Sequence, residues 1–296
     1  IDDPTYYSRR YLVEPLEERT RTNYGLPTQM LLEQDATKAN LLDACQALHP
    51  ALVFTASHGL MASGQSLEVQ QAVNGALCCH RADETKPLSD WLLTAADFPS
   101  NEPFLEGAIV FQFACFGYGT PAESDLNHWL GGPLQNAPAS FIAAIPKKLL
   151  ANPNGPIAFI SHLDKALLAG FDDPQQPEPP AKQSWNSRLS PFAQALDELL
   201  QSLRPSGLAL RPMADRYNSN NAWLTTVDDR LQRLRRRNVP VPSDIQIQMA
   251  DAFTFRTDAQ NYMIFGDPAA RLDLPGGPQP TTHSPQQEEV APGGSP

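Results

Sequence analysis

The sequence has few cysteines, few positive charges and no long apolar run. Its four cysteines are too few for a disulfide-built secreted domain, which favours a reducing, cytoplasmic location. Lys and Arg total 22 against 33 Asp and Glu, a formal charge of −11. That sign disfavours non-specific binding of phosphate backbones, so we expect no direct nucleic-acid partner. No stretch reaches the roughly 18 to 20 apolar residues of a membrane span, so we expect no membrane partner either.

Proline is the one residue type in clear excess. It accounts for 29 of 296 residues, about twice the usual share, which argues against a fold made mainly of long helices. Apolar residues make up 41% and charged residues 19%, a composition typical of globular proteins. The chain begins Ile1-Asp2-Asp3-Pro4, without an initiator Met or a signal-peptide pattern, so we expect further sequence upstream.

Short apolar runs alternate with helical patterns along the chain. Near-continuous apolar runs are typical of strands buried on both faces of a parallel sheet, so an α/β fold is predicted. The expected strands are 51–57, 107–115, 156–161 and 262–265. The expected helices are one that ends near Leu48 with Asp35 or Thr37 as its cap, 140–150 with a kink or restart at Pro146, 191–203, and 224–237.

Proline-rich segments mark the expected loops and the domain boundary. Residues 171–183 hold four prolines and predict an exposed loop. Residues 273–296, rich in Pro and Gly, predict a disordered tail that follows a single domain of residues 1–272.

Two predicted strands end in reactive residues followed closely by glycine. Ser57-His58-Gly59 closes the first strand, and Ala114-Cys115-Phe116-Gly117 closes the second. Residues just past the carboxyl ends of neighbouring parallel strands meet in one crevice, where open α/β folds bind ligands. Cys115 and His58 would there supply a thiolate nucleophile and a proton donor for the leaving amine. The amides of Gly59 and Cys115 would form an oxyanion hole.

A structural interpretation of the same residues stays open. A single Cys at a strand end is often a small buried apolar residue, and a single His there is often structural. The paired setting favours catalysis without deciding between the two.

The order of these residues resembles the caspase-like (clan CD) cysteine peptidases, in which a His-Gly is followed about fifty residues later by a Cys after an apolar strand. Within that group the chain is most similar to the bacterial CHAT and gingipain-like branch, which is related to separase. The segments that carry the resemblance are FTASHGL (54–60), GAIVFQFACFGYGTP (107–121), AFISHLDKALLAGF (158–171) and NYMIFGDPAARL (261–272).

The resemblance implies a mostly parallel sheet of about six strands between helices, with Cys115 as nucleophile and His58 as its partner. It also implies a first strand, and a sensor or regulatory domain or protein, upstream of the helix that begins near Tyr11. Phe113 stands where caspases carry a glutamine that receives an acidic P1 side chain, so cleavage after aspartate is not expected.

Two acidic residues are candidates for the S1 pocket. In separase-like members, an acid in the segment after the third of these strands meets a basic P1 side chain, and Asp164 matches that place. The alternative for Asp164 is a solvated aspartate at a helix start. Asp125 is a second S1 candidate.

The remaining polar clusters predict no cofactor site. Cys78-Cys79-His80 lacks the spacing of a tetrahedral metal site, so we expect no metal and no cofactor. His128 and His162 are interpreted as structural or exposed. The arginines of 230–237 predict a solvated helix face, which a peptidase specific for basic residues could itself cut.

These observations predict a cytoplasmic cysteine endopeptidase that cleaves a protein substrate after a basic residue and acts as a regulated effector in bacterial antiviral defence. One alternative is a caspase-fold scaffold or interaction domain without catalytic activity. Another is a thiol-dependent acyl transferase, which would use the same Cys115 and His58 with a different acceptor.

Overall fold

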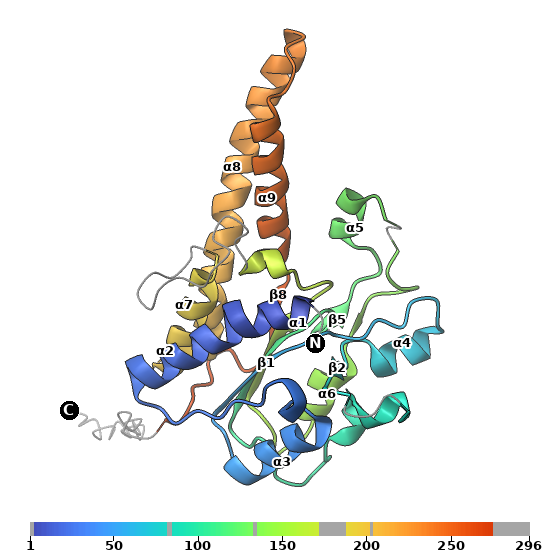
Figure 1. Ribbon diagram of the computed structural model, residues 1–296, viewed down its shortest axis with the longest axis vertical. Coiled ribbons are helices and arrows are strands. Elements are labelled where there is room, and N and C mark those ends of the chain that lie inside the picture. Colours follow the sequence, from blue (N-terminus) through green and yellow to red (C-terminus); the bar gives the residue numbers. More distant parts are fainter. Residues whose placement is uncertain (1–2, 82–84, 133–134, 172–187, 202–203, 275–296) are drawn as a thin grey trace, which may run out of the picture.

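A computed structural model describes residues 3–81, 85–132, 135–171, 188–201 and 204–274. Its main sheet has the strand order β1-β4-β7-β8 (Figure 1). β1, β4 and β7 are parallel, and β8 runs antiparallel to β7. The strands are β1 (Leu52–Ala56), β4 (Ile109–Phe113), β7 (Ala158–His162) and β8 (Tyr262–Gly266). The predicted α/β class is confirmed, with a mostly parallel sheet that has four strands in the described residues.

Helices pack on both faces of the sheet, and β4 shows how the sequence divides between them. Successive side chains of a strand point to opposite faces. Ile109 and Phe111 therefore lie in one core with α2 (Glu14–Tyr24) and α7 (Ser190–Leu200), while Val110 lies in a second core. That second core is formed with α3 (Lys38–Leu48) and α6 (Ala144–Leu150).

The N-terminal helices are held on the first core by an ion pair. α1 (Asp3–Ser8) leads through a π-helical turn, Arg9–Val13, into α2. Arg19 of α2 donates two hydrogen bonds, of 2.7 and 2.5 Å, to the carboxylate of Asp197 on α7. Tyr24 donates a third bond of 2.9 Å, and burial next to that carboxylate raises the pKa of its hydroxyl to about 12. This bidentate ion pair between Arg19 and Asp197 fixes α2 against α7.

Two predicted helix starts can be compared with the structure. Of the two predicted caps of α3, Thr37 is the one used: its hydroxyl accepts a hydrogen bond of 3.2 Å from the Asn40 amide, whereas Asp35 lies in a 3-10 turn before the helix. Pro146 does not kink its helix, because α6 begins at Ala144 and the proline falls in the first turn. A first-turn N–H has no partner within the helix, so its absence there costs little.

Most of the remaining short elements lie near the carboxyl edge of the sheet or the second core, whereas the turn Ser206–Leu210 packs on the first core beside the end of β8. Two small antiparallel ribbons pair β2 with β3 and β5 with β6. The bounds are β2 (Leu77–Cys78), β3 (Leu92–Leu93), β5 (Gly119–Thr120), β6 (Phe141–Ile142), α4 (Leu67–Val73) and α5 (Asp125–Leu130), with 3-10 turns at Glu33–Asp35, Leu88–Asp90, Ala95–Asp97, Leu168–Gly170 and Ser206–Leu210.

A helical hairpin projects from this body. α8 (Arg211–Arg236) and α9 (Ser243–Gln260) lie side by side and extend away from the sheet (Figure 1). The predicted helix 224–237 is the distal part of α8. Most of the predicted loop 171–183, and nearly all of the predicted tail 273–296, lie outside the described residues.

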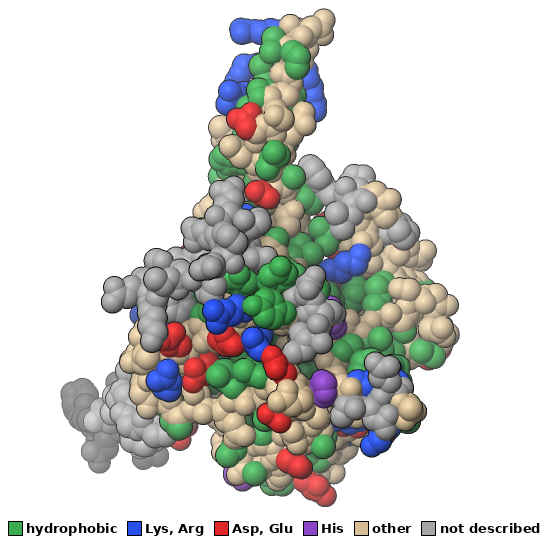
Figure 2. Space-filling view, viewed as in Figure 1, with side chains coloured by type: hydrophobic (Ala, Val, Ile, Leu, Met, Phe, Trp, Pro, Cys, Tyr) green, Lys and Arg blue, Asp and Glu red, His purple; other side chains and the backbone are tan. Residues whose placement is uncertain are grey.

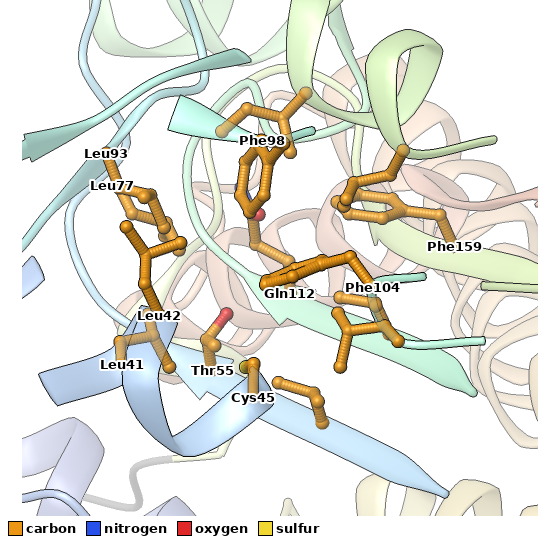
Figure 3. Close-up of a pocket in the computed structure, with 15 residues that line it drawn as sticks. Leu41, Leu42, Cys45, Thr55, Leu77, Leu93, Phe98, Phe104, Gln112 and Phe159 are labelled. Carbon is orange, nitrogen blue, oxygen red and sulfur yellow. The ribbon is translucent and has the colours of Figure 1, made fainter. Parts of the chain in front are cut away.

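A cavity of about 30 Å³ lies in the second core, where Leu, Phe and Cys side chains converge (Figure 3). Thr55 contributes its hydroxyl, which is buried without a hydrogen-bond partner among the described residues. A space of this size holds about one water, and its lining offers that water few polar partners. None of the predicted site residues lines it, so we treat it as a packing defect.

Candidate active site

His58 and Cys115 lie at the same edge of the sheet. β1 and β4 pair in parallel with Ala56 opposite Phe113, and the Ser57 amide continues the ladder with a bond of 3.1 Å to the Phe113 carbonyl. Each of the two reactive residues follows its strand by two positions. The register therefore places them side by side at the carboxyl ends of neighbouring strands, as the sequence predicts.

Gly59 brings the two strand ends into direct contact. A Cβ atom built on Gly59 would lie 1.8 Å from the carbonyl oxygen of Cys115, so only glycine allows this approach. On its other side, the His58 carbonyl accepts a hydrogen bond of 3.0 Å from the Cys78 amide. The backbone of His58 is thus fixed between β4 and β2, while its side chain is exposed.

Two backbone amides at this edge have no hydrogen-bond acceptor in another described residue. Gly59 lies directly opposite Leu77 in an antiparallel bridge. The hydrogen bonds of this bridge are made by the residues on either side: the Cys78 amide donates to the His58 carbonyl, and the Leu60 amide donates to the Ala76 carbonyl. In such a pair the central N–H points away from the neighbouring strand. Neither the Gly59 amide nor the Cys115 amide donates a hydrogen bond to another described residue. Both are therefore able to serve the predicted oxyanion hole.

The turn after Cys115 is held by the segment that follows β7. Phe116 is buried with a left-handed backbone, φ of 59°, and its amide donates to the Asp164 carbonyl at 2.6 Å. The Cys115 thiol donates a long hydrogen bond of 3.7 Å to the Ala166 carbonyl. We call residues 162–170 the strap, because this segment crosses the candidate site and contacts Cys115.

Burial controls the ionisation of Cys115. The thiol is half-buried, and desolvation, supported by the negative charge of Asp164, raises its pKa above the usual value. The resting thiol is therefore protonated at neutral pH. His58 is the titratable residue that the sheet register places at the equivalent position on the neighbouring strand.

Asp164 is buried within the strap, and the alternative of a solvated helix-start aspartate is wrong. It is 4% exposed, has a left-handed φ of 75°, and precedes no helix directly. One carboxylate oxygen accepts a hydrogen bond of 3.1 Å from the Asn136 side chain. The other makes no hydrogen bond to another described residue. The Asp164 carboxylate is thus held by Asn136 on a segment that contacts Cys115, and one of its oxygens has no hydrogen-bond donor among the described residues.

A chain of side chains links Asp164 to α5. Asn127 donates to Asn136 at 3.1 Å, and Lys165 donates in turn to Asn127. Asp125, the other S1 candidate, begins α5 and is exposed, with Gln260 at 3.5 Å from its carboxylate. Its position is that of a solvated acid at a helix N-terminus, where a negative charge is favourable. Of the two S1 candidates, Asp164 is therefore buried and Asp125 is exposed to solvent.

A buried pair behind the strap was not expected from the sequence. His162 and Asp258 have side chains that are fully buried, with Nε2 of the histidine 3.3 Å from the carboxylate. The same carboxylate accepts the Leu167 amide at 3.1 Å. His162 is structural, which was one of the two roles predicted for it. The local sequence around Asp258 carries no signal of this role, since its partners lie about ninety residues earlier.

Arg216 completes the support of the strap from α8. Its guanidinium donates to the Gly170 carbonyl at 2.7 Å and to the Arg188 carbonyl. Burial lowers the pKa of this guanidinium, while the nearby Asp258 opposes that effect. Helices α8 and α9 therefore hold the strap at its far end with buried charged groups.

No metal centre is formed by the described residues, since no three His, Cys, Asp or Glu side chains converge in them. The Cys78 and Cys79 amides instead bond to the carbonyls of His58 and Trp91. Burial raises the pKa of the Cys79 thiol to about 11, so it is protonated rather than a ready metal ligand. The described helices include none with the length and apolar character needed to cross a bilayer.

Comparison with known proteins adds no assignment: no family model, no curated protein and no solved structure matches the chain.

Proposed function

We propose that the protein is a cysteine endopeptidase in which Cys115 is the nucleophile and His58 its acid–base partner. The observation that carries the proposal is the parallel register of β1 and β4, which brings both residues to one sheet edge. The contact of Gly59 with the Cys115 backbone supports it, because it joins the two strand ends closely. A caspase-like fold of about six strands is part of the proposal, on the resemblance of four sequence segments.

The chemistry follows from the arrangement. His58 removes the thiol proton as substrate binds, and the Cys115 sulfur forms a bond to the scissile carbonyl carbon. The amides of Gly59 and Cys115 donate to the resulting oxyanion. His58 returns the proton to the leaving amine, and water then hydrolyses the thioester. No cofactor enters these steps.

Asp164 is proposed to select a basic P1 side chain. It is buried on the strap that contacts Cys115 and Phe116, and Asn136 fixes its carboxylate while one oxygen stays unpaired among the described residues. A guanidinium would pair with that carboxylate through charge-assisted hydrogen bonds. Asp125 is a weaker candidate, because its exposed carboxylate would gain little from an ion pair in water.

The wider setting is also a proposal. We infer a cytoplasmic peptidase that acts on a protein substrate under the control of an upstream regulatory domain or protein, as an effector in bacterial antiviral defence. The support is the resemblance to CHAT-type peptidases and the small number of cysteines.

A peptide library with varied P1 residues tests the proposal. Wild-type protein should cleave after Arg or Lys, and Cys115→Ala should retain less than about a thousandth of that activity while folding normally. His58→Ala should be nearly as damaging and non-additive with it, because the two residues act as a unit. Additive effects in the double variant would refute the pairing.

Labelling with iodoacetamide separates the proposal from its alternatives. A peptidase and an acyl transferase should both show selective alkylation of Cys115 that slows in His58→Ala, whereas an inactive scaffold should show no dependence on His58. Release of a free carboxylate from the peptide substrate identifies hydrolysis. Transfer to an added amine would instead support the transferase.

A further inference from the structure

The end of the α8–α9 hairpin differs in charge from the rest of the chain. Residues 228–244 contain five arginines against three aspartates, a local charge of +2, although the whole chain carries a formal charge of −11. Figure 2 shows these positive side chains gathered at the far end of the hairpin, while negative side chains lie mainly over the body. None of the five arginines forms an ion pair with another described residue. The arginines are Arg230, Arg233, Arg235, Arg236 and Arg237.

A groove runs between the two helices just below this end. It encloses about 250 Å³ and has apolar side chains from both helices, among them Trp223, Val227 and Ile245. Arg230 and Arg233 also line it, with Thr226 and Gln248. Apolar surface beside unpaired cations is the arrangement that binds an amphipathic segment carrying carboxylates.

The two helices of the hairpin leave apolar side chains at this end only partly covered. Only Val227, Leu231 and Ile245 are fully buried in the apolar cluster between the helices there. Trp223, which lines the groove, and Met249 pack against this cluster and are only partly buried, so apolar area remains uncovered there. A third helix against this groove would bury apolar area that two helices cannot bury for each other.

We infer that this groove docks an acidic amphipathic helix of a partner protein. Apolar side chains of that helix enter the groove beside Trp223 and Val227, and its carboxylates pair with Arg230 and Arg233. Arg suits this role, because its planar guanidinium binds a carboxylate through two parallel hydrogen bonds. The negative charge of the body disfavours the extended phosphate contacts of a nucleic acid and repels an acidic partner elsewhere.

The inference is independent of the proposed peptidase activity, so it can be tested with that activity removed. The probe is a fluorescein-labelled synthetic helix of 18 residues, with Leu at positions spaced three and four apart and Glu on its other face. Full-length Cys115→Ala protein, which would not cleave the probe, is titrated and fluorescence anisotropy is recorded.

We expect saturable binding that weakens at least tenfold in the double variant Arg230→Glu/Arg233→Glu and also weakens with added salt. The matched control, Arg21→Glu/Arg271→Glu, makes the same change in net charge at exposed arginines of the body and should bind as the parent does. Trp223→Ala should weaken binding without changing its salt dependence, because it removes apolar contact only.

Several results would overturn the inference. These are the absence of binding, equal binding by a peptide with Lys in place of Glu, or equal loss in the two double variants. A single-stranded oligothymidylate of 18 nucleotides is titrated in parallel. If it binds more tightly than the acidic helix and depends on Arg230 and Arg233, the groove is a nucleic-acid site and the inference is wrong. Circular dichroism of each variant checks that the hairpin helices are retained.

Discussion

Replacing Gly59 by alanine tests how the two strand ends of the candidate site are joined. The added methyl carbon would lie 1.8 Å from the Cys115 carbonyl oxygen, 2.8 Å from the carbonyl carbon and 3.0 Å from the nitrogen. To reach even a tight contact of 3.0 Å to the oxygen, the backbones would have to separate by roughly 1.2 Å. The neighbouring atoms are backbone, so no side chain can rotate away.

This separation affects stability and activity by different amounts. Over-packing of this kind costs about 1 to 3 kcal/mol of unfolding free energy. A displacement of about 1 Å between nucleophile, base and oxyanion hole lowers turnover by on the order of a hundredfold. We therefore expect Gly59→Ala to remain folded, with kcat/KM for an Arg-P1 peptide reduced by about two orders of magnitude.

The assay combines urea unfolding with peptide cleavage and with alkylation of Cys115. Gly132→Ala is the matched control, because the nearest atoms to its added Cβ are 3.9 Å away and the site is exposed. That control should leave all three measurements unchanged. A Gly59→Ala protein with the stability and activity of the parent would show that the strand ends are not in contact, and the reasoning would fail.

Three further predictions concern Cys115 and the acidic residues of the strap and its support. Because burial raises the pKa of Cys115, its alkylation rate should keep rising with pH beyond about 8.5, the ordinary value for a thiol, and a plateau below pH 8 would contradict this. Asp164→Ala should lower kcat/KM for Arg substrates by on the order of a hundredfold and largely spare neutral ones, and an Arg preference that survives the change would exclude Asp164 from S1. Asp258→Ala removes the carboxylate that accepts the Leu167 amide and lies 3.3 Å from His162 Nε2, although the Asp258 carbonyl, 3.1 Å from Nε2, remains. The unfolding free energy should therefore fall by about 1 to 3 kcal/mol in urea titrations. The half-exposed Asp251 on the same helix is the control, and its alanine variant should change stability by less than about 1 kcal/mol.

The parallel strands could be predicted from the sequence because β4 and β7 are buried along their whole length and β1, at the edge of the described sheet, is half-buried throughout. The apolar runs 51–57 and 107–115 contain β1 and β4, the run 156–161 covers all of β7 except His162, and the later run 262–265 lies within β8. Continuous burial requires continuous apolar character, so each run has a signal that is independent of its neighbours. Strands of two residues, such as β2 and β5, are too short to give such a signal.

The full extent of the helical hairpin could not be predicted from local sequence patterns. The sequence predicts a helix over 224–237, but α8 begins thirteen residues earlier, at Arg211. Its first half is rich in Asn and other polar residues with low helix propensity, for example over 217–221. In α9, the apolar residues do not form one stripe. Contact between the two helices, rather than propensity, stabilises these segments.

The sequence by itself determined the α/β class, the positions of the main strands, and the placement of His58 and Cys115 just beyond two of them. These follow from the order of residues along single strands, and parallel pairing brings equivalent strand ends together. Only the tertiary structure decided that Asp164 is buried rather than solvated, and that Asp258 supports the strap. Asp258 lies 91 residues from the Leu167 amide that it binds, and such a contact leaves no periodic trace in the chain. It arises from the packing of α9 against the sheet edge, which local sequence patterns do not encode.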